Sequence, residues 1–214
     1  MKKSLLSASA LIAAAVLASS AQAHEKGDIL VRAGVATVVP HESSDDVLGL
    51  GEFRINNDTQ LGLTFTYMLT DNWGVELVAA SPFKHNIGLK ATGDIASAKH
   101  LPPTLLGQYY FGQADSKVRP YVGLGVNYTF FFDEEFNQTG KNAGLSNLDL
   151  DSSVGLAAEA GVDVMVTDKW FANAAVWWMD IDTKANFDVA GGGHQSIDTS
   201  IDPIVFMLGV GYKF

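Results

Sequence analysis

The 214-residue sequence lacks cysteine, so a fold in an oxidising compartment is achieved without disulfide bonds. Basic residues are scarce, with 14 Lys and Arg against 24 Asp and Glu and a formal net charge of −10. Nucleic-acid binding needs a basic face, so this balance argues against a nucleic-acid partner. Beyond the first 23 residues no run approaches the roughly 18 consecutive apolar residues that suggest a membrane-spanning helix.

The first 23 residues have the three parts of a secretory signal peptide. Lys2 and Lys3 form a positive start, residues 5–17 form a short apolar run, and Ala21-Gln22-Ala23 is a small-x-small cleavage site. A membrane anchor is the weaker alternative, because a spanning helix needs about 20 apolar residues. We therefore predict cleavage after residue 23 and a single domain over 24–214, which keeps 12 basic and 24 acidic residues.

The last nine residues, 206–214, alternate in polarity like a β-strand. Their apolar positions are Phe206, Leu208, Val210, Tyr212 and Phe214. A soluble protein rarely leaves such an apolar edge unpaired, because exposed edges aggregate. The pattern fits a closed barrel in which lipid faces one side of the strand and a narrow lumen faces the other.

Eight segments alternate in this way, and their outward positions are almost free of charge. They cover residues 28–38, 59–69, 73–82, 100–112, 118–132, 153–166, 170–182 and 206–214. Short polar turns alternate with long connections at 39–58, 83–99, 133–152 and 183–199. This predicts an all-β, eight-stranded antiparallel transmembrane β-barrel with short periplasmic turns and long extracellular loops. A soluble β-sandwich is disfavoured because its outer face would carry charges.

The inward positions divide into two sets by height. Charged residues lie toward the periplasmic end, at Arg32, Glu76, Arg119, Asp163 and Lys213, with Glu159 near mid-barrel. Opposite charges in a narrow lumen are expected to pair, so we interpret them as a polar plug. The alternative is that these ion pairs only fill space and stabilise the barrel.

Apolar residues occupy the outer half of the predicted lumen. They are Val38, Val78, Ala80, Leu106, Phe131, Trp177, Met179, Val205 and Met207. Bulky Trp and flexible Met side chains suit varied apolar ligands, which predicts a binding well open toward the loops. A dry, packed core with no ligand is an equal alternative. The two interpretations differ only in the free volume inside the lumen, which the sequence does not give.

Three of the six prolines flank one predicted hairpin: Pro82 ends one strand, and Pro102 and Pro103 open its partner. Proline donates no backbone hydrogen bond, so the wall is expected to be interrupted there. Such a lateral opening would let an apolar ligand move from the well into the membrane. The alternative is an ordinary end of the strands.

No motif indicates catalysis, a cofactor or a metal site. The five histidines lie at the terminus or in predicted loops, apart from His100 at the start of a strand, and no nucleophile motif accompanies it. Acidic loop edges at 133–135 and 149–151 could hold divalent ions that bridge lipopolysaccharide, although solvated faces are the simpler interpretation. The run at 191–193 is a glycine-rich loop tip. We predict that the protein is not an enzyme.

Four segments carry a family resemblance: residues 57–68, residues 96–104 with His-Leu-Pro-Pro-Thr at 100–104, residues 119–123 and residues 178–183. The chain from 24 to 214 resembles the outer membrane protein W (OmpW) family. The resemblance implies an eight-stranded barrel in the bacterial outer membrane that passes small hydrophobic molecules through an apolar lumen, with Val78 and Trp177 as its constriction. It also implies a bacteriocin receptor role in some bacteria, and phage binding or adhesion are related alternatives.

The partners expected from these features are small hydrophobic solutes, outer-membrane lipids and lipopolysaccharide. The terminal Phe214 resembles the signal read by the barrel assembly machinery. Since eight strands close within one chain, we expect a monomer.

Overall fold

The computed structural model describes residues 24–89 and 92–214. The predicted signal peptide, 1–23, lies outside the described residues and stays a prediction. Within the described ranges no helix has both the length and the apolar character needed to cross a bilayer.

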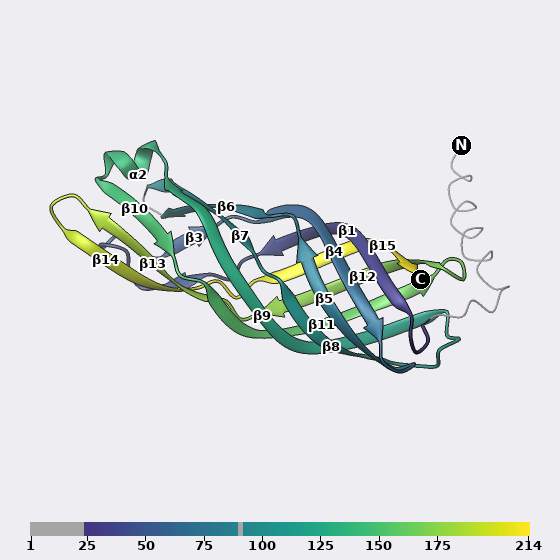
Figure 1. The fold of residues 1–214 in the computed structure, drawn as a ribbon. Coiled ribbons are helices and arrows are strands. Elements are labelled where there is room, and N and C mark those ends of the chain that lie inside the picture. Colours follow the sequence, from purple (N-terminus) through teal and green to yellow (C-terminus); the bar gives the residue numbers. More distant parts are fainter. Residues whose placement is uncertain (1–23, 90–91) are drawn as a thin grey trace, which may run out of the picture.

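Eight antiparallel strands form a closed barrel (Figure 1). They are β1 (Ile29–Val39), β4 (Asp58–Met68), β5 (Trp73–Ala80), β8 (Thr104–Tyr110), β9 (Val118–Phe136), β11 (Ser153–Met165), β12 (Trp170–Met179) and β15 (Ile204–Lys213). Each strand pairs with the next, and the pairings of β9 with β11 and of β15 with β1 complete the ring. The predicted eight-stranded barrel is confirmed.

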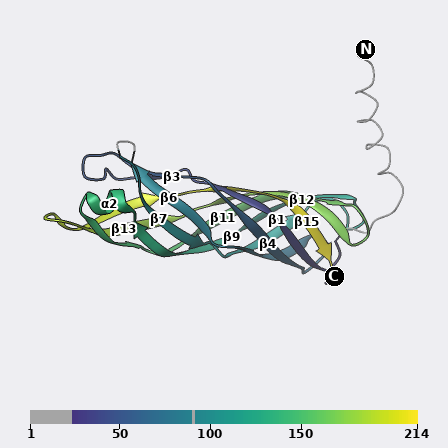
Figure 2. The same ribbon diagram turned by 90° about the horizontal axis from the view of Figure 1, so that it is seen from above.

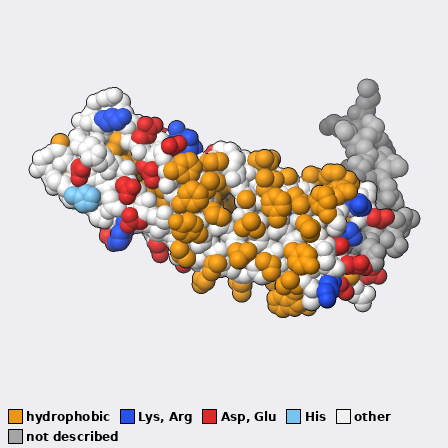
Figure 3. Space-filling model, viewed as in Figure 1, with side chains coloured by type: hydrophobic (Ala, Val, Ile, Leu, Met, Phe, Trp, Pro, Cys, Tyr) orange, Lys and Arg blue, Asp and Glu red, His pale blue; other side chains and the backbone are white. Residues whose placement is uncertain are grey.

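The two faces of each strand follow the predicted alternation. On β12, Trp177 is 2% exposed inside the barrel, whereas its neighbour Trp178 is 43% exposed outside. On β15, Phe206, Leu208 and Val210 are exposed while Val205 and Met207 are buried. The outward apolar side chains gather into a belt over the barrel half of the molecule, and charged side chains lie beyond both ends of this belt (Figure 3). A belt of this kind matches the hydrocarbon layer of a membrane.

The backbones of β1 and β15 approach each other closely at two glycines. Gly34 and Gly209 face each other across this pairing. A Cβ atom on Gly34 would lie 2.4 Å from the carbonyl oxygen of Leu208, and one on Gly209 would lie 2.3 Å from that of Ala33. Larger residues at these positions would therefore clash with backbone.

The long connections, predicted as loops, contain further secondary structure that the sequence did not reveal. They form β2 (Ser43–Ser44), β3 (Phe53–Ile55), β6 (Phe83–Leu89), β7 (Gly93–Leu101), α2 (Gln138–Asn142), β10 (Leu145–Leu150), β13 (Asp182–Val189) and β14 (Gly193–Ser200), while β9 continues upward to Phe136. Together these elements, with the upper part of β9, form what we call the extension, which prolongs the barrel away from the C-terminus (Figures 1 and 2).

The extension has an apolar core of its own. It contains Val47, Phe53, Ile87, Leu89, Ile95, Ala96, Ala98, Phe136, Leu145, Ala185, Phe187 and Ile197. The outward side chains of the same hairpins are polar because they meet water rather than lipid. Polar and small residues therefore concealed the strand pattern in the sequence.

Candidate functional site

The upper half of the barrel contains an apolar cluster, which we call the apolar well. It consists of Ala36, Val38, Phe83, Leu106, Ala157, Ala175, Trp177, Met179, Ile181, Val205 and Met207, with Val78, Ala80, Phe131 and Ile201 packed against it. Strand alternation places these side chains inside, since Trp177 and Met179 share the inward face of β12 with Asn173. All nine residues predicted to line the outer half of the lumen lie here: Val38, Val78, Ala80, Leu106, Phe131, Trp177, Met179, Val205 and Met207.

The cavities in and above the apolar well are small. A cavity of about 20 Å³ lies between Trp177, Met207 and Val78. A second, of about 30 Å³, lies beside His100 and Phe131, and a third, of about 40 Å³, lies within the core of the extension. A water molecule needs about 10–15 Å³ on this measure. In this conformation the lumen is therefore nearly filled by side chains, and a solute must displace them.

The wall beside the apolar well is interrupted at the predicted prolines. The β5–β8 ladder ends with Val78 opposite Thr104, and the β6–β7 ladder begins with Phe83 opposite His100. Between them, residues 79–82 face 101–103 without paired positions among the described residues; we call this the wall gap. Pro82, Pro102 and Pro103 all lie in it. The cavity beside Trp177 is also lined by Ala79, Ala80 and Pro102, so it reaches from the apolar well to the wall gap.

The wall gap also divides one predicted strand. The segment 100–112 is not continuous, because β7 ends at Leu101 and β8 begins at Thr104. The preceding strand ends at Ala80 rather than at residue 82. Prolines cannot donate to a ladder, which accounts for both changes.

The lower half of the barrel is built around the guanidinium group of Arg32, which is fully buried. Its Nη2 lies 2.6 Å from Oδ2 of Asp163, and its Nη1 lies 3.3 Å from Oε1 of Glu76. It also donates to Thr66 and to the Tyr110 hydroxyl, at 2.9 and 2.8 Å. Two buried carboxylates therefore surround one buried cation, as opposite charges in a narrow lumen require.

The other predicted members of the polar plug are placed differently. Glu159 is buried and accepts from Gln108 Nε2 at 2.8 Å. Arg119 donates to the backbone oxygens of Phe111, His24 and Asp71 rather than to a carboxylate side chain. Lys213 lies apart from the group around Arg32 and pairs with Asp28 at 3.7 Å. Arg119 and Lys213 therefore lie outside the ion pairs around Arg32, since backbone oxygens and Asp28 are within their reach.

Part of the lower end of the lumen is filled by aromatic and apolar side chains rather than by charged ones. It contains Leu30, Met68, Tyr110, Tyr121, Met165 and Phe171. His24 is buried against it, with its ring 5.5 Å from Tyr110 and 5.2 Å from Phe171, and its Nε2 lies 2.8 Å from Asp163. Alternation in the sequence could not predict this role, because His24 precedes every alternating segment.

Two further histidines meet at the junction of the barrel and the extension. His85 of β6 and His100 of β7 are 7% and 5% exposed, and their Nε2 atoms lie 3.1 Å apart. Burial lowers the pKa of both imidazoles, that of His100 to about 3. Both rings are therefore neutral at pH 7.

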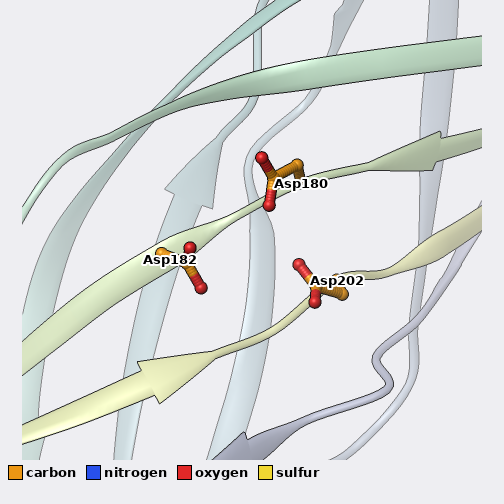
Figure 4. Close-up of side chains that lie close together, drawn as sticks. All are labelled: Asp180, Asp182 and Asp202. Carbon is orange, nitrogen blue, oxygen red and sulfur yellow. The ribbon is translucent and has the colours of Figure 1, made fainter.

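Three carboxylates approach one another where β12 leads into β13 and β14 leads into β15 (Figure 4). Oxygen atoms of Asp180, Asp182 and Asp202 lie within 4.8 Å of one another. Asp202 Oδ1 accepts from the backbone N–H of Ile181 at 3.2 Å, and Asp182 accepts from Ser200 Oγ. None of the three is fully buried, and exposed acidic groups often occur without an ion. The geometry alone identifies no metal centre.

A closed antiparallel barrel with an apolar outer belt, short turns at one end and a folded extension at the other defines the class of outer-membrane β-barrel proteins.

Within this class the chain belongs to the OmpW family, whose family model matches residues 25–214. Outer membrane protein W of Escherichia coli (strain K12) is 56% identical over 215 residues, covering 100% of both chains. The crystal structure of the outer membrane protein OprG from Pseudomonas aeruginosa aligns with a TM-score of 0.85 and 48% identity, covering 90% of this chain and 98% of that one. The protein is therefore located in the bacterial outer membrane, among its lipids.

A more distant relative from Pseudomonas aeruginosa is named dibenzothiophene metabolism operon protein PahQ. It is 25% identical over 174 residues, covering 77% of this chain and 75% of that protein.

Proposed function

We propose that the protein passes small hydrophobic molecules from the extension into the apolar well and then sideways through the wall gap into the membrane. The observation that carries this proposal is the cavity that extends from Trp177 to Ala79, Ala80 and Pro102 at the wall gap. It is lined by apolar side chains and backbone, which suits an apolar solute.

The lower half of the barrel supports a sideways route. Below the apolar well, Arg32, Asp163 and Glu76 fill the lumen with hydrogen-bonded charges. An apolar solute gains nothing from entering this region, since it would have to separate buried ion pairs. The membrane beside the wall gap is the more favourable destination.

The name of the distant relative agrees with an apolar cargo. Dibenzothiophene is a fused aromatic molecule without charge, and PahQ is named for the operon of its metabolism. We infer a non-enzymatic role, since the close relatives are named outer membrane proteins.

The small cavity volumes favour one competing function, a closed barrel that acts as a receptor for bacteriocin or phage or as an adhesin. In that case the extension would bind the partner, and the interior would only support it. Lipopolysaccharide is a proposed partner under either function.

Neighbouring tryptophans provide the test. The full chain is expressed in Gram-negative cells without their own family member, and the initial uptake of radiolabelled naphthalene is measured. Trp177→Ala should increase uptake several-fold by widening the apolar well, and Val78→Arg should reduce it to the level of cells without the protein. Trp178→Ala removes the same side chain from the lipid-facing side and should leave uptake unchanged.

Each variant is first checked for folding by its heat-modifiable mobility in gels. If folded Trp177→Ala and Val78→Arg proteins both transport naphthalene at the wild-type rate, passage through the apolar well is refuted. The receptor function would then be favoured.

A further inference from the structure

The buried histidine pair lies between the extension and the apolar well, a position that we call the neck. The cavity there is lined by His85, His100 and Phe131, with Val38 of the apolar well on one side and Ile87 of the extension core on the other. The neck thus places two imidazole rings in a mainly apolar passage between the core of the extension and the apolar well.

Hydrogen bonding fixes the tautomer of both rings. Nδ1 of His85 lies 2.6 Å from the backbone oxygen of Asn56, and a carbonyl oxygen only accepts, so Nδ1 carries the hydrogen. Because the ring is neutral, its Nε2 is then an acceptor. The Nε2 of His100, 3.1 Å away, must therefore be the donor of the contact between the rings.

This arrangement leaves Nδ1 of His100 as a bare acceptor. Within residues 24–89 and 92–214, no protein group donates a hydrogen bond to this buried atom. Burying an acceptor without a partner costs free energy, and such atoms in native structures call for an explanation.

Aromatic rings pack against the imidazole of His100. The ring of Phe131 is stacked against that of His100, with centroids 5.9 Å apart and an interplanar angle of 20°. The ring of Phe83 lies 5.5 Å away on a tilted plane. A flat aromatic solute that displaces a ring here can keep the stacking contacts.

We propose that His100 selects among solutes at the neck by accepting a hydrogen bond at Nδ1, favouring aromatic molecules that carry an O–H or N–H donor. His85 is a positioning residue, since its bond to Asn56 holds His100 in the accepting tautomer. The inference rests on the proposed function and narrows its solute class from apolar molecules in general to hydroxyarenes and N–H heteroaromatics.

Matched bicyclic solutes test the selectivity in the uptake assay described above. Naphthalene has no polar group, 2-naphthol adds a donor, and quinoline has only an acceptor. Relative to His100→Phe, the wild type should favour 2-naphthol over naphthalene by roughly threefold to tenfold, the usual contribution of one hydrogen bond. His194→Phe, at an exposed position of the extension, is the matched control and should keep the wild-type ratio.

A variant of His85 tests its role in positioning His100. His85→Leu removes the partner of His100 Nε2, so His100 is free to adopt the tautomer that donates from Nδ1. Uptake of quinoline relative to naphthalene should then rise above the wild-type ratio. An unchanged 2-naphthol preference in folded His100→Phe, or an unchanged quinoline ratio in folded His85→Leu, would overturn the inference.

A measurement that needs no transport separates this inference from the proposed function. In micelles containing the ¹⁵N-histidine-labelled full chain, the ring nitrogens report the tautomers directly. We expect Nδ1–H at His85 and Nε2–H at His100, with a shift of His100 Nδ1 on addition of 2-naphthol but not of naphthalene. The opposite tautomers, or the absence of that shift, would refute the inference even if naphthalene uptake is confirmed. Absent uptake with the expected shift would refute only the transport route.

Discussion

The two halves of the barrel meet the same lipid outside but differ completely inside. The lower half contains Arg32 with its buried carboxylates, within a wall whose strands are paired throughout. The upper half contains the apolar well around Trp177 beside the wall gap. Outward residues therefore determine how the barrel lies in the membrane. Inward residues independently determine which solutes can enter the lower and the upper half of the lumen.

The lower half therefore contributes mainly to stability, and the upper half is the part that a solute can enter. Ion pairs and hydrogen bonds hold the lower half in one arrangement, whereas Trp177 and Met207 belong to a cluster of apolar side chains. Thioether side chains adapt to irregular spaces at small cost. The lower half is expected to be rigid, and the upper half is expected to yield to a solute.

The largest effect is expected in the lower half. Arg32→Met leaves Asp163 and Glu76 buried without their cation, which should lower the free energy of unfolding by about 3–5 kcal/mol. Urea unfolding in detergent micelles measures the change. Arg54→Met, at an exposed position of the extension, is the control and should have little effect. If both variants lose the same free energy of unfolding, the buried ion pairs of Arg32 do not stabilise the barrel more than an exposed arginine does.

A smaller, pH-dependent effect is expected at the neck. The pKa of His100 is about 3 in the folded protein, well below its usual value near 6.5, because burial disfavours the charged ring. The unfolded hairpin binds more protons, so stability is full above about pH 6.5 and falls as pH decreases toward 3. Between pH 7.5 and 5, opening of the β6–β7 hairpin should become easier by about 2 kcal/mol.

Amide hydrogen exchange in β6 and β7, corrected for intrinsic rates, measures that change. In His100→Phe most of this pH dependence should disappear. A hairpin whose opening is insensitive to pH in the wild type would contradict the burial argument.

The smallest effect on stability, with a clear effect on transport, is expected at the wall gap. Replacing both Pro102 and Pro103 with Val restores two N–H donors opposite residues 79–82, so the ladder can extend. Naphthalene uptake should fall several-fold while the free energy of unfolding changes by less than about 1 kcal/mol. Pro120→Val, on the lipid-facing side of β9, is the matched control. Undiminished uptake in the double variant would exclude the lateral route.

Alternation in the sequence was sufficient to predict the barrel, because a strand between lipid and a narrow lumen must show different residues on its two faces. It placed the adjacent Trp177 and Trp178 on opposite sides, as the structure does. The same argument failed for the extension, since water tolerates polar, small and apolar residues on an outer face. The segments 83–99 and 183–199, which form most of the β6–β7 and β13–β14 hairpins, were therefore predicted as loops.

The candidate site could be predicted only in part from the sequence. Inward position followed from alternation, but the small cavity volumes depend on rotamers and packing. The pairing of His85 with His100 depends on the β6–β7 register, in which Phe83 faces His100 and His85 faces Ala98. Without that hairpin no pattern brings the two rings together. His24 was missed for a similar reason, because its contact with Asp163 joins distant parts of the chain.

The pairing of β1 with β15 has a consequence for biogenesis. It joins Leu30 to Lys213 and lines up ten residue pairs drawn from opposite ends of the described chain. Such non-local pairing is slow to form, because the entropy cost of closing a long loop is incurred before the stabilising contacts are made. Until β15 reaches β1, two strand edges stay open and prone to aggregation. The time between secretion and closure is therefore the most vulnerable interval for this protein, and protection of those two edges is what its assembly requires most.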